Sequence, residues 1–168
     1  MARARDRWLM RVGFALISSC CSLACDDEEA PSTPTVSSDL SALRRLFPVP
    51  DGVTSARWLV RARRPPGSRL VPGPTDTLLF AYLETAPDFW VKQGYQLPAL
   101  NTGAAVEMMV SDVKPILPAS VLKESELKGD SYRLKCEPRA TTGLSSVAHP
   151  CTFAARCGTG LLLVFEGN

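Results

Sequence analysis

Thr77-Leu78-Leu79-Phe80-Ala81-Tyr82-Leu83-Glu84 is the stretch of this chain that decides the fold. It is apolar nearly throughout, and such continuous apolar runs are typical of strands that are buried on both faces. At a solvated sheet edge, many of these side chains would remain in water. We therefore predict that Thr77–Glu84 lies in the interior of a sheet, between a strand at Ala56–Arg63 and a strand near the C-terminus.

The neighbouring strands are predicted from alternation and apolar content. Along Ala56–Arg63 the side chains divide into two faces, Ala56, Trp58, Val60 and Ala62 on one and Arg57, Leu59, Arg61 and Arg63 on the other. Ser131–Glu137 alternates in the same way, so we predict one strand there. Leu161–Phe165 is a final apolar strand that follows a Gly-Thr-Gly segment.

Two short helices have recognisable ends. The first begins at Ser38 or Asp39, either of which can cap its amide groups, and ends before Pro48. The second covers Pro87–Gln93, with Gly94 as its end.

The middle of the chain has weaker patterns. Ala104–Val110 fits a strand or a helical turn, Val113–Pro118 reads as extended, and Leu122–Lys128 reads as a short helix. The loop Arg64–Asp76 is rich in Pro and Gly. Together these segments predict an α+β domain, with a mainly antiparallel sheet, one or two short covering helices and long Pro/Gly-rich loops.

The first residues of the chain have the layout of a secretory signal peptide. Arg3, Arg5, Arg7 and Arg11 precede a short apolar run. That run has only about a dozen residues, whereas a membrane-spanning helix needs roughly 20. The segment therefore predicts export.

A cysteine at the end of this segment resembles the lipidation site of bacterial lipoproteins. Ile17-Ser18-Ser19-Cys20 fits the pattern of an aliphatic residue, two small residues and cysteine; Ser22-Leu23-Ala24-Cys25 fits except at Ser22. The resemblance implies a multiply acylated Cys20 or Cys25 that anchors the protein in a cell-envelope membrane, outside the cytoplasm. There are two alternatives. Ordinary cleavage would release a soluble secreted protein, and an uncleaved segment would act as a weak anchor.

These features divide the chain into three parts. Residues 1–24 form the signal peptide, which ends at residue 19 if Cys20 is lipidated. Residues 25–38 form a disordered tether of acidic, Pro, Ser and Thr residues, and residues 39–168 form a single globular α+β domain. The net charge of the whole chain is +2, but the segment before Cys25 accounts for it, and the remainder has a net charge of −1. This balance does not support nucleic-acid binding.

Three cysteines near the C-terminus are disulfide candidates, because disulfides persist outside the cytoplasm. Of Cys136, Cys151 and Cys157, we prefer the pair Cys136–Cys151, whose loop of roughly 15 residues would stabilise by about 3 kcal/mol. Cys157 is then the unpaired one, since glycines at 158 and 160 suggest a mobile approach to the final strand. A zinc site formed by these cysteines and His149 is the weaker alternative, because the usual paired-ligand spacing is missing.

Five arginines form a local basic cluster: Arg57, Arg61, Arg63, Arg64 and Arg69. Such a cluster is usually a solvent-exposed face. The functional hypothesis is that it binds anions, either phospholipid head groups or a charged cell-wall polymer.

The sequence lacks a phosphate-binding glycine loop, a nucleophile elbow and a paired carboxylate motif. We therefore expect a lipid-anchored envelope protein without a cofactor, which binds or positions an envelope protein or cell-wall polymer and is not an enzyme. A small envelope enzyme, with a site near His149 or in the Arg64–Asp76 loop, is the alternative.

Overall fold

The structure is a computed structural model that describes residues 34–62, 77–94, 96–100, 105–146 and 150–167. The signal peptide, Cys20, Cys25 and most of the tether lie outside these residues. The same holds for His149, for the loop Arg64–Asp76, and for Arg63, Arg64 and Arg69 of the basic cluster.

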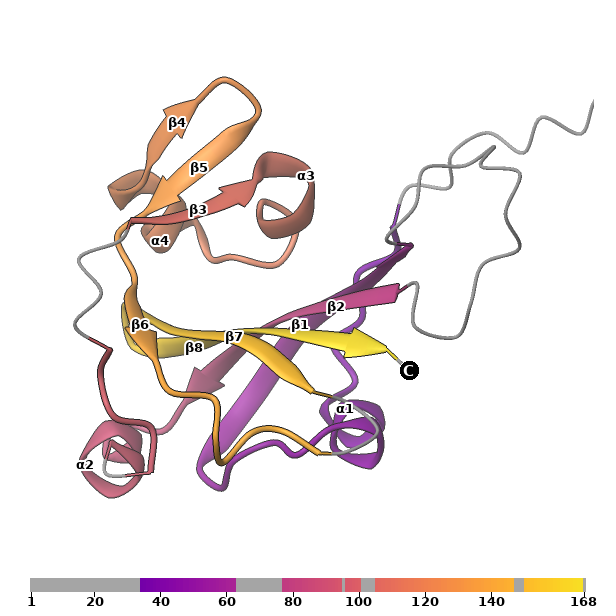
Figure 1. Cartoon of the computed structure of the whole chain (residues 1–168), viewed down its shortest axis with the longest axis vertical. Helices are drawn as coiled ribbons and strands as arrows, with labels where there is room; N and C mark the ends of the chain where they lie inside the picture. Colours follow the sequence, from indigo (N-terminus) through magenta and orange to yellow (C-terminus); the bar gives the residue numbers. More distant parts are fainter. Residues whose placement is uncertain (1–33, 63–76, 95, 101–104, 147–149, 168) are drawn as a thin grey trace, which may run out of the picture. The chain divides into compact units, whose positions relative to one another are not determined.

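The larger of two antiparallel sheets has five strands (Figure 1). Their order is β1 (Val53–Ala62), β2 (Thr77–Thr85), β8 (Gly160–Gly167), β7 (Cys151–Cys157) and β6 (Glu137–Arg139). β2 lies between β1 and β8, which confirms the prediction from the apolar stretch. Leu79, Ala81 and Leu83 are 3% exposed or less on one face of β2, and Phe80 and Tyr82 are 5% and 3% exposed on the other. Both faces of this strand are therefore buried.

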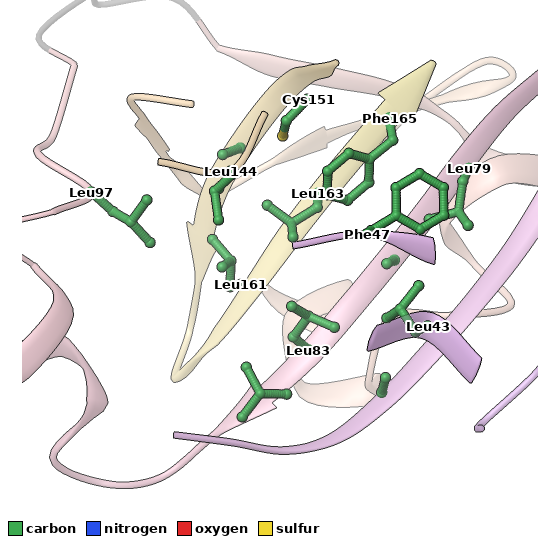
Figure 2. Close-up of a cluster of buried hydrophobic side chains, with 14 of the residues drawn as sticks. Leu43, Phe47, Leu79, Leu83, Leu97, Leu144, Cys151, Leu161, Leu163 and Phe165 are labelled. Atoms are coloured by element: carbon green, nitrogen blue, oxygen red, sulfur yellow. The ribbon is translucent and has the colours of Figure 1, made fainter. Parts of the chain in front are cut away.

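A first core cluster covers one face of the large sheet (Figure 2). α1 (Leu40–Leu46) contributes Leu43, and the following Phe47 packs on Phe165 of β8 with ring centroids 4.5 Å apart. The cap predicted for α1 is present, because the Asp39 carboxylate accepts a hydrogen bond of 2.8 Å from the Ala42 N–H. α2 (Phe89–Gln93) adds Phe89 to the same cluster.

The smaller sheet has the strand order β3 (Val106–Met109), β5 (Ser131–Leu134) and β4 (Glu126–Lys128). Two short helices accompany it, α3 (Val110–Val113) and α4 (Ala119–Glu124). Val106, Leu134 and residues of these helices form a second core cluster with Phe80, Tyr82 and Val164 on the other face of the large sheet. The two sheets therefore pack against each other through this second core cluster, and the predicted α+β class is confirmed.

Three sequence predictions for this region are wrong in detail. Ser131–Glu137 is not one strand: β5 ends at Leu134 in the small sheet, and β6 begins at Glu137 in the large one. The segment Leu122–Lys128 is divided between α4 and β4, because the backbone turns extended at Ser125, with φ −91° and ψ 153°. The Ser125 hydroxyl donates a hydrogen bond of 2.7 Å to the Val121 carbonyl of the last helical turn. Val113–Pro118 is not extended but continues α3 as a turn, in which the Ile116 and Leu117 N–H groups bond to the Val113 carbonyl.

A tight hairpin joins β7 to β8. Gly158 has a φ of +61°, which few residues other than glycine adopt easily. Gly160 is required for a different reason: a Cβ there would fall on the Tyr82 hydroxyl and 2.7 Å from the Leu83 carbonyl oxygen. The glycines at 158 and 160 therefore permit a close turn into the final strand.

Candidate binding groove

A groove of about 560 Å³ lies between the large sheet and the edge of the small one. Its floor is the face of the large sheet that carries the second core cluster, with Leu78 and Phe80 from β2 and Val164 from β8. These strands pair in a register that sets Phe80 opposite Val164 and Leu78 opposite Glu166. Thr152, Phe153, Pro138 and Leu100 line the groove as well. Its volume is in the range of small-molecule binding sites.

The other wall is the outer edge of β3. Four consecutive residues, Ala105, Val106, Glu107 and Met108, line the groove. Because neighbouring side chains of a strand point to opposite faces, a groove that touches four in a row runs along the strand's edge. Val106 and Met108 meanwhile contact the second core cluster, which fixes the strand in place.

The lining is predominantly apolar. Its polar side chains in the described residues are Glu107, Thr152 and Glu166. The Thr152 hydroxyl donates a hydrogen bond of 3.3 Å to the Val164 carbonyl, so it is satisfied within the sheet. The arrangement is suited to holding an apolar group against the floor, with carboxylates nearby.

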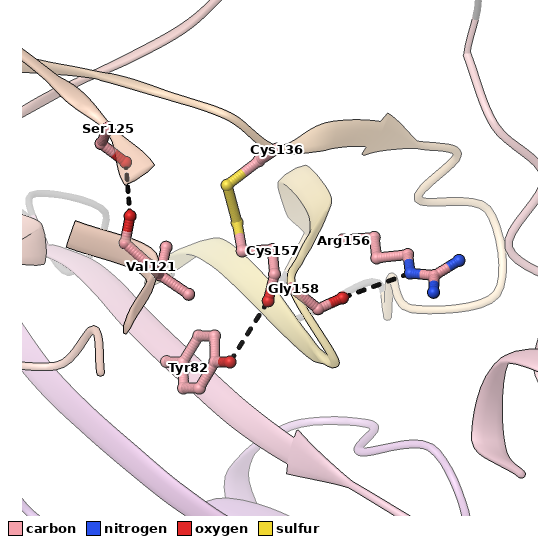
Figure 3. The surroundings of a disulfide bond; sticks show 7 residues. All are labelled: Tyr82, Val121, Ser125, Cys136, Arg156, Cys157 and Gly158. Carbon is pink, nitrogen blue, oxygen red and sulfur yellow. Dashed lines mark hydrogen bonds between the residues drawn. A yellow bond between two sulfur atoms is a disulfide. The ribbon is translucent and has the colours of Figure 1, made fainter. Parts of the chain in front are cut away.

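A disulfide joins Cys136 to Cys157 (Figure 3). Cys136 lies between β5 of the small sheet and β6 of the large one, and Cys157 ends β7. The bridge therefore ties the crossover between the sheets to the β7–β8 hairpin. Beside it, the Tyr82 hydroxyl donates a hydrogen bond of 3.2 Å to the Cys157 carbonyl, and burial raises the pKa of this phenol.

The presence of a disulfide among the three cysteines is confirmed, but the preferred pair Cys136–Cys151 is wrong. β7 has a bulge between Cys151 and Phe153, where the pairing with β8 shifts by one residue. Because a shift of one residue exchanges the faces of a strand, Cys151 belongs to the first core cluster and Cys157 to the second. Cys151 therefore lies across the sheet from Cys136.

Cys151 is a buried free thiol, 4% exposed. Desolvation raises its pKa to about 12, so the thiol stays protonated at neutral pH and is a poor nucleophile. The zinc alternative is also wrong for the three cysteines, since two are bonded to each other and the third is on the opposite face. In the described part of the chain, no three His, Cys, Asp or Glu side chains gather as metal ligands.

The two described arginines of the basic cluster contact the protein itself. Arg57 donates a hydrogen bond of 2.6 Å to the Pro115 carbonyl. Arg61 forms an ion pair with Asp112 and donates to the Ser111 hydroxyl at 2.6 Å. Both side chains thus connect β1 to α3 and the turn after it.

A second arginine arrangement was not predicted from the sequence. The guanidinium carbons of Arg139 and Arg156 each lie 5.0 Å from the ring centroid of Trp90. Trp90 donates to the Thr159 carbonyl at 2.9 Å, and Arg139 forms an ion pair with Glu137. These contacts fasten α2 to β6, β7 and the hairpin, and cation–π stacking of this kind stabilises such a junction.

Comparison with protein-family models, curated proteins and solved structures finds no match to this chain. Among the described residues, no helix is long and apolar enough to cross a membrane. The groove residues come from separate strands, so sequence patterns did not reveal them. The available signal was the short apolar alternation of Val106 and Met108 around Glu107.

Proposed function

We propose that this protein is a lipid-anchored protein of the cell envelope whose domain binds an apolar group of an envelope component, without catalysis. The observation that carries the binding role is the groove between the two sheets, with its floor of Leu78, Phe80 and Val164. A concave site with a predominantly apolar lining is the default candidate for a binding site.

Two features support the location. The N-terminal segment has the signal and lipidation patterns described above, and the domain contains a disulfide. Structural disulfides persist in exported proteins and are rare in the cytoplasm.

The short length of the proposed tether supports a binding partner at or near the membrane. Chain length limits the span from Cys25 to Pro34 to about 30 Å, and the span from Cys20 to about 50 Å. Val36 packs against the second core cluster, which also forms the groove floor. A lipid anchor would therefore keep the domain within this distance of the membrane surface, where envelope proteins and lipids are concentrated.

Mass spectrometry of the purified N-terminus tests the anchor. We expect a multiply acylated Cys20 or Cys25, and replacement of both cysteines by Ser is expected to release the protein from membranes. An unmodified N-terminus at Cys25 or Asp26 would contradict lipidation and leave ordinary secretion.

Binding in the groove is tested with Nile red, a neutral apolar dye whose fluorescence rises on binding. Leu100, 43% exposed, lines the groove, and Leu46, 48% exposed, lies on α1 away from it. We expect Leu100→Asp to weaken dye binding and Leu46→Asp to leave it unchanged. Equal effects of both variants would place the dye elsewhere and remove the support for this site.

A further inference from the structure

We propose that the groove takes an extended polypeptide segment, which adds as a strand to the outer edge of β3. This inference rests on the proposed function, because it assigns the ligand class of the same groove. Strand addition of this kind draws affinity from main-chain hydrogen bonds and specificity from pockets for alternate side chains.

The hydrogen-bond pattern of β3 shows which of its backbone groups face outward. β3 and β5 pair Val106 with Leu134 and Met108 with Tyr132, and in the same register the Val110 N–H donates to the Asp130 carbonyl at 2.8 Å. In an antiparallel pair, alternate residues direct both backbone groups to the partner strand. The even-numbered residues of β3 therefore bond to β5, and Glu107 and Met109 direct their N–H and C=O groups away from it.

The outward groups of Glu107 border the groove, and those of Met109 follow on the same strand edge. β3 is the end strand of the small sheet, and in the described part of the chain no backbone group pairs with its outer edge. An unpaired strand edge is a template for another strand. A segment placed there would turn every second side chain toward Leu78, Phe80 and Val164 on the groove floor.

The backbone groups favour a polypeptide over an acyl chain. An acyl chain lying against β3 would remove water from the Glu107 and Met109 amide groups and offer no hydrogen bond in return, which is unfavourable. A peptide backbone replaces those water contacts with hydrogen bonds and still fills the groove with apolar side chains.

Charge complementarity defines the peptide further. The charged residues that line the groove in the described part of the chain are Glu107 and Glu166. Arg133 of β5 lies opposite Glu107 in one strand pair and opposite Glu126 in the other. Glu107 is therefore an acidic side chain of β3 that a basic residue of the segment can meet. We expect an extended segment with alternate apolar residues and a flanking Lys or Arg.

The test uses a panel of synthetic peptides with alternating Val, Leu or Phe residues between terminal lysines. Two matched forms accompany each peptide: one is N-methylated at alternate residues, which removes its donors, and one has Glu in place of Lys. We expect the unmodified basic peptides to bind the full-length protein in calorimetric titrations, the N-methylated forms not to bind, and the acidic forms to bind more weakly.

A proline variant removes one donor from the protein side. Met109 has a φ of −61°, which proline adopts without strain, and its N–H faces outward. Met109→Pro is therefore expected to keep the wild-type melting temperature and to weaken peptide binding by about tenfold, while Met109→Ala keeps full affinity.

The outcomes separate this inference from the proposed function. Nile red binding without peptide binding, or equal binding of methylated and unmethylated peptides, would refute strand addition while the apolar site stands. Absence of both dye and peptide binding would refute the proposed function as well. If Met109→Pro fails to fold, the N-methylated peptides still decide the question.

Discussion

Reduction of the Cys136–Cys157 disulfide is expected to destabilise the domain by about 3 kcal/mol. The two cysteines are 21 residues apart in the sequence. Closing a loop of this length removes about 11 cal/mol/K of entropy from the unfolded chain, which amounts to about 3.3 kcal/mol at 25 °C. For a domain whose total stability is about 5–15 kcal/mol, this is a large share.

The measurement is guanidinium unfolding at pH 7 with and without a reductant, followed by far-UV circular dichroism. Reduction leaves both sulfur atoms in the core, so the comparison isolates the loop closure from the loss of packing. Cys151→Ala is the matched control and is expected to show the same sensitivity to reductant as the wild type. The variant with Cys136→Ala and Cys157→Ala is expected to show none.

Two results would refute this reasoning. A change below about 1 kcal/mol on reduction would show that the bridge contributes little to constraining the unfolded chain. Loss of the reductant effect in Cys151→Ala would show that Cys151 takes part in the bond.

Three further predictions concern the core, an ion pair and the buried thiol. Leu79→Asp is expected to unfold the domain, because Leu79 is 3% exposed. As a control, Leu127→Asp, at a side chain that is 59% exposed, should change the free energy of unfolding by less than about 0.5 kcal/mol. A folded Leu79→Asp variant in circular dichroism would contradict the position of β2. Arg61→Met is expected to cost about 1–3 kcal/mol in urea unfolding, because the Asp112 side chain is only 12% exposed and loses its charged partner, keeping only the hydrogen bond from the Ser111 hydroxyl. An unchanged midpoint would show that the ion pair is not stabilising. Burial raises the pKa of Cys151 from 9.0 to about 12. The contribution of this thiol to stability is therefore complete below pH 9 and falls as the pH rises toward 12, by up to about 1.4 kcal/mol per pH unit. Between pH 9.5 and 10.5, the free energy of unfolding of Cys151→Ala should fall less steeply with pH than that of the wild type, and identical slopes would refute this prediction.

The parts of the fold that the sequence predicts are those with a strong local pattern. Thr77–Glu84 is apolar on both faces, so it has one favourable place, between two other strands. Asp39 and Pro48 define α1 because capping and loss of an amide donor act within a few residues.

The parts that it does not predict depend on tertiary contacts. β7 was missed because its pattern is interrupted by a bulge that only pairing with β8 reveals. Ser131–Glu137 alternates continuously, yet the chain passes from one sheet to the other within it, and the Cys136 disulfide fixes the crossing. Alternation determines which side chains share a face and does not determine which sheet a residue joins.

The candidate site was the least predictable feature. The groove exists because β3 ends the small sheet beside the floor formed by β2 and β8, and these segments are far apart in the sequence. The arginine cluster was visible as a run of charge, but Arg57 and Arg61 bond to α3 and its turn, which no spacing in the sequence indicates.

The bulge in β7 also bears on oxidative folding. In the unfolded chain, Cys151 is closer in sequence to Cys157 than Cys136 is, so random oxidation favours the shorter, incorrect loop. Once β7 has paired with β8, the extra residue holds Cys151 on the opposite side of the sheet from Cys157, and only Cys136 remains in reach. The one-residue bulge therefore directs oxidation to the Cys136–Cys157 bond and leaves Cys151 as a free thiol.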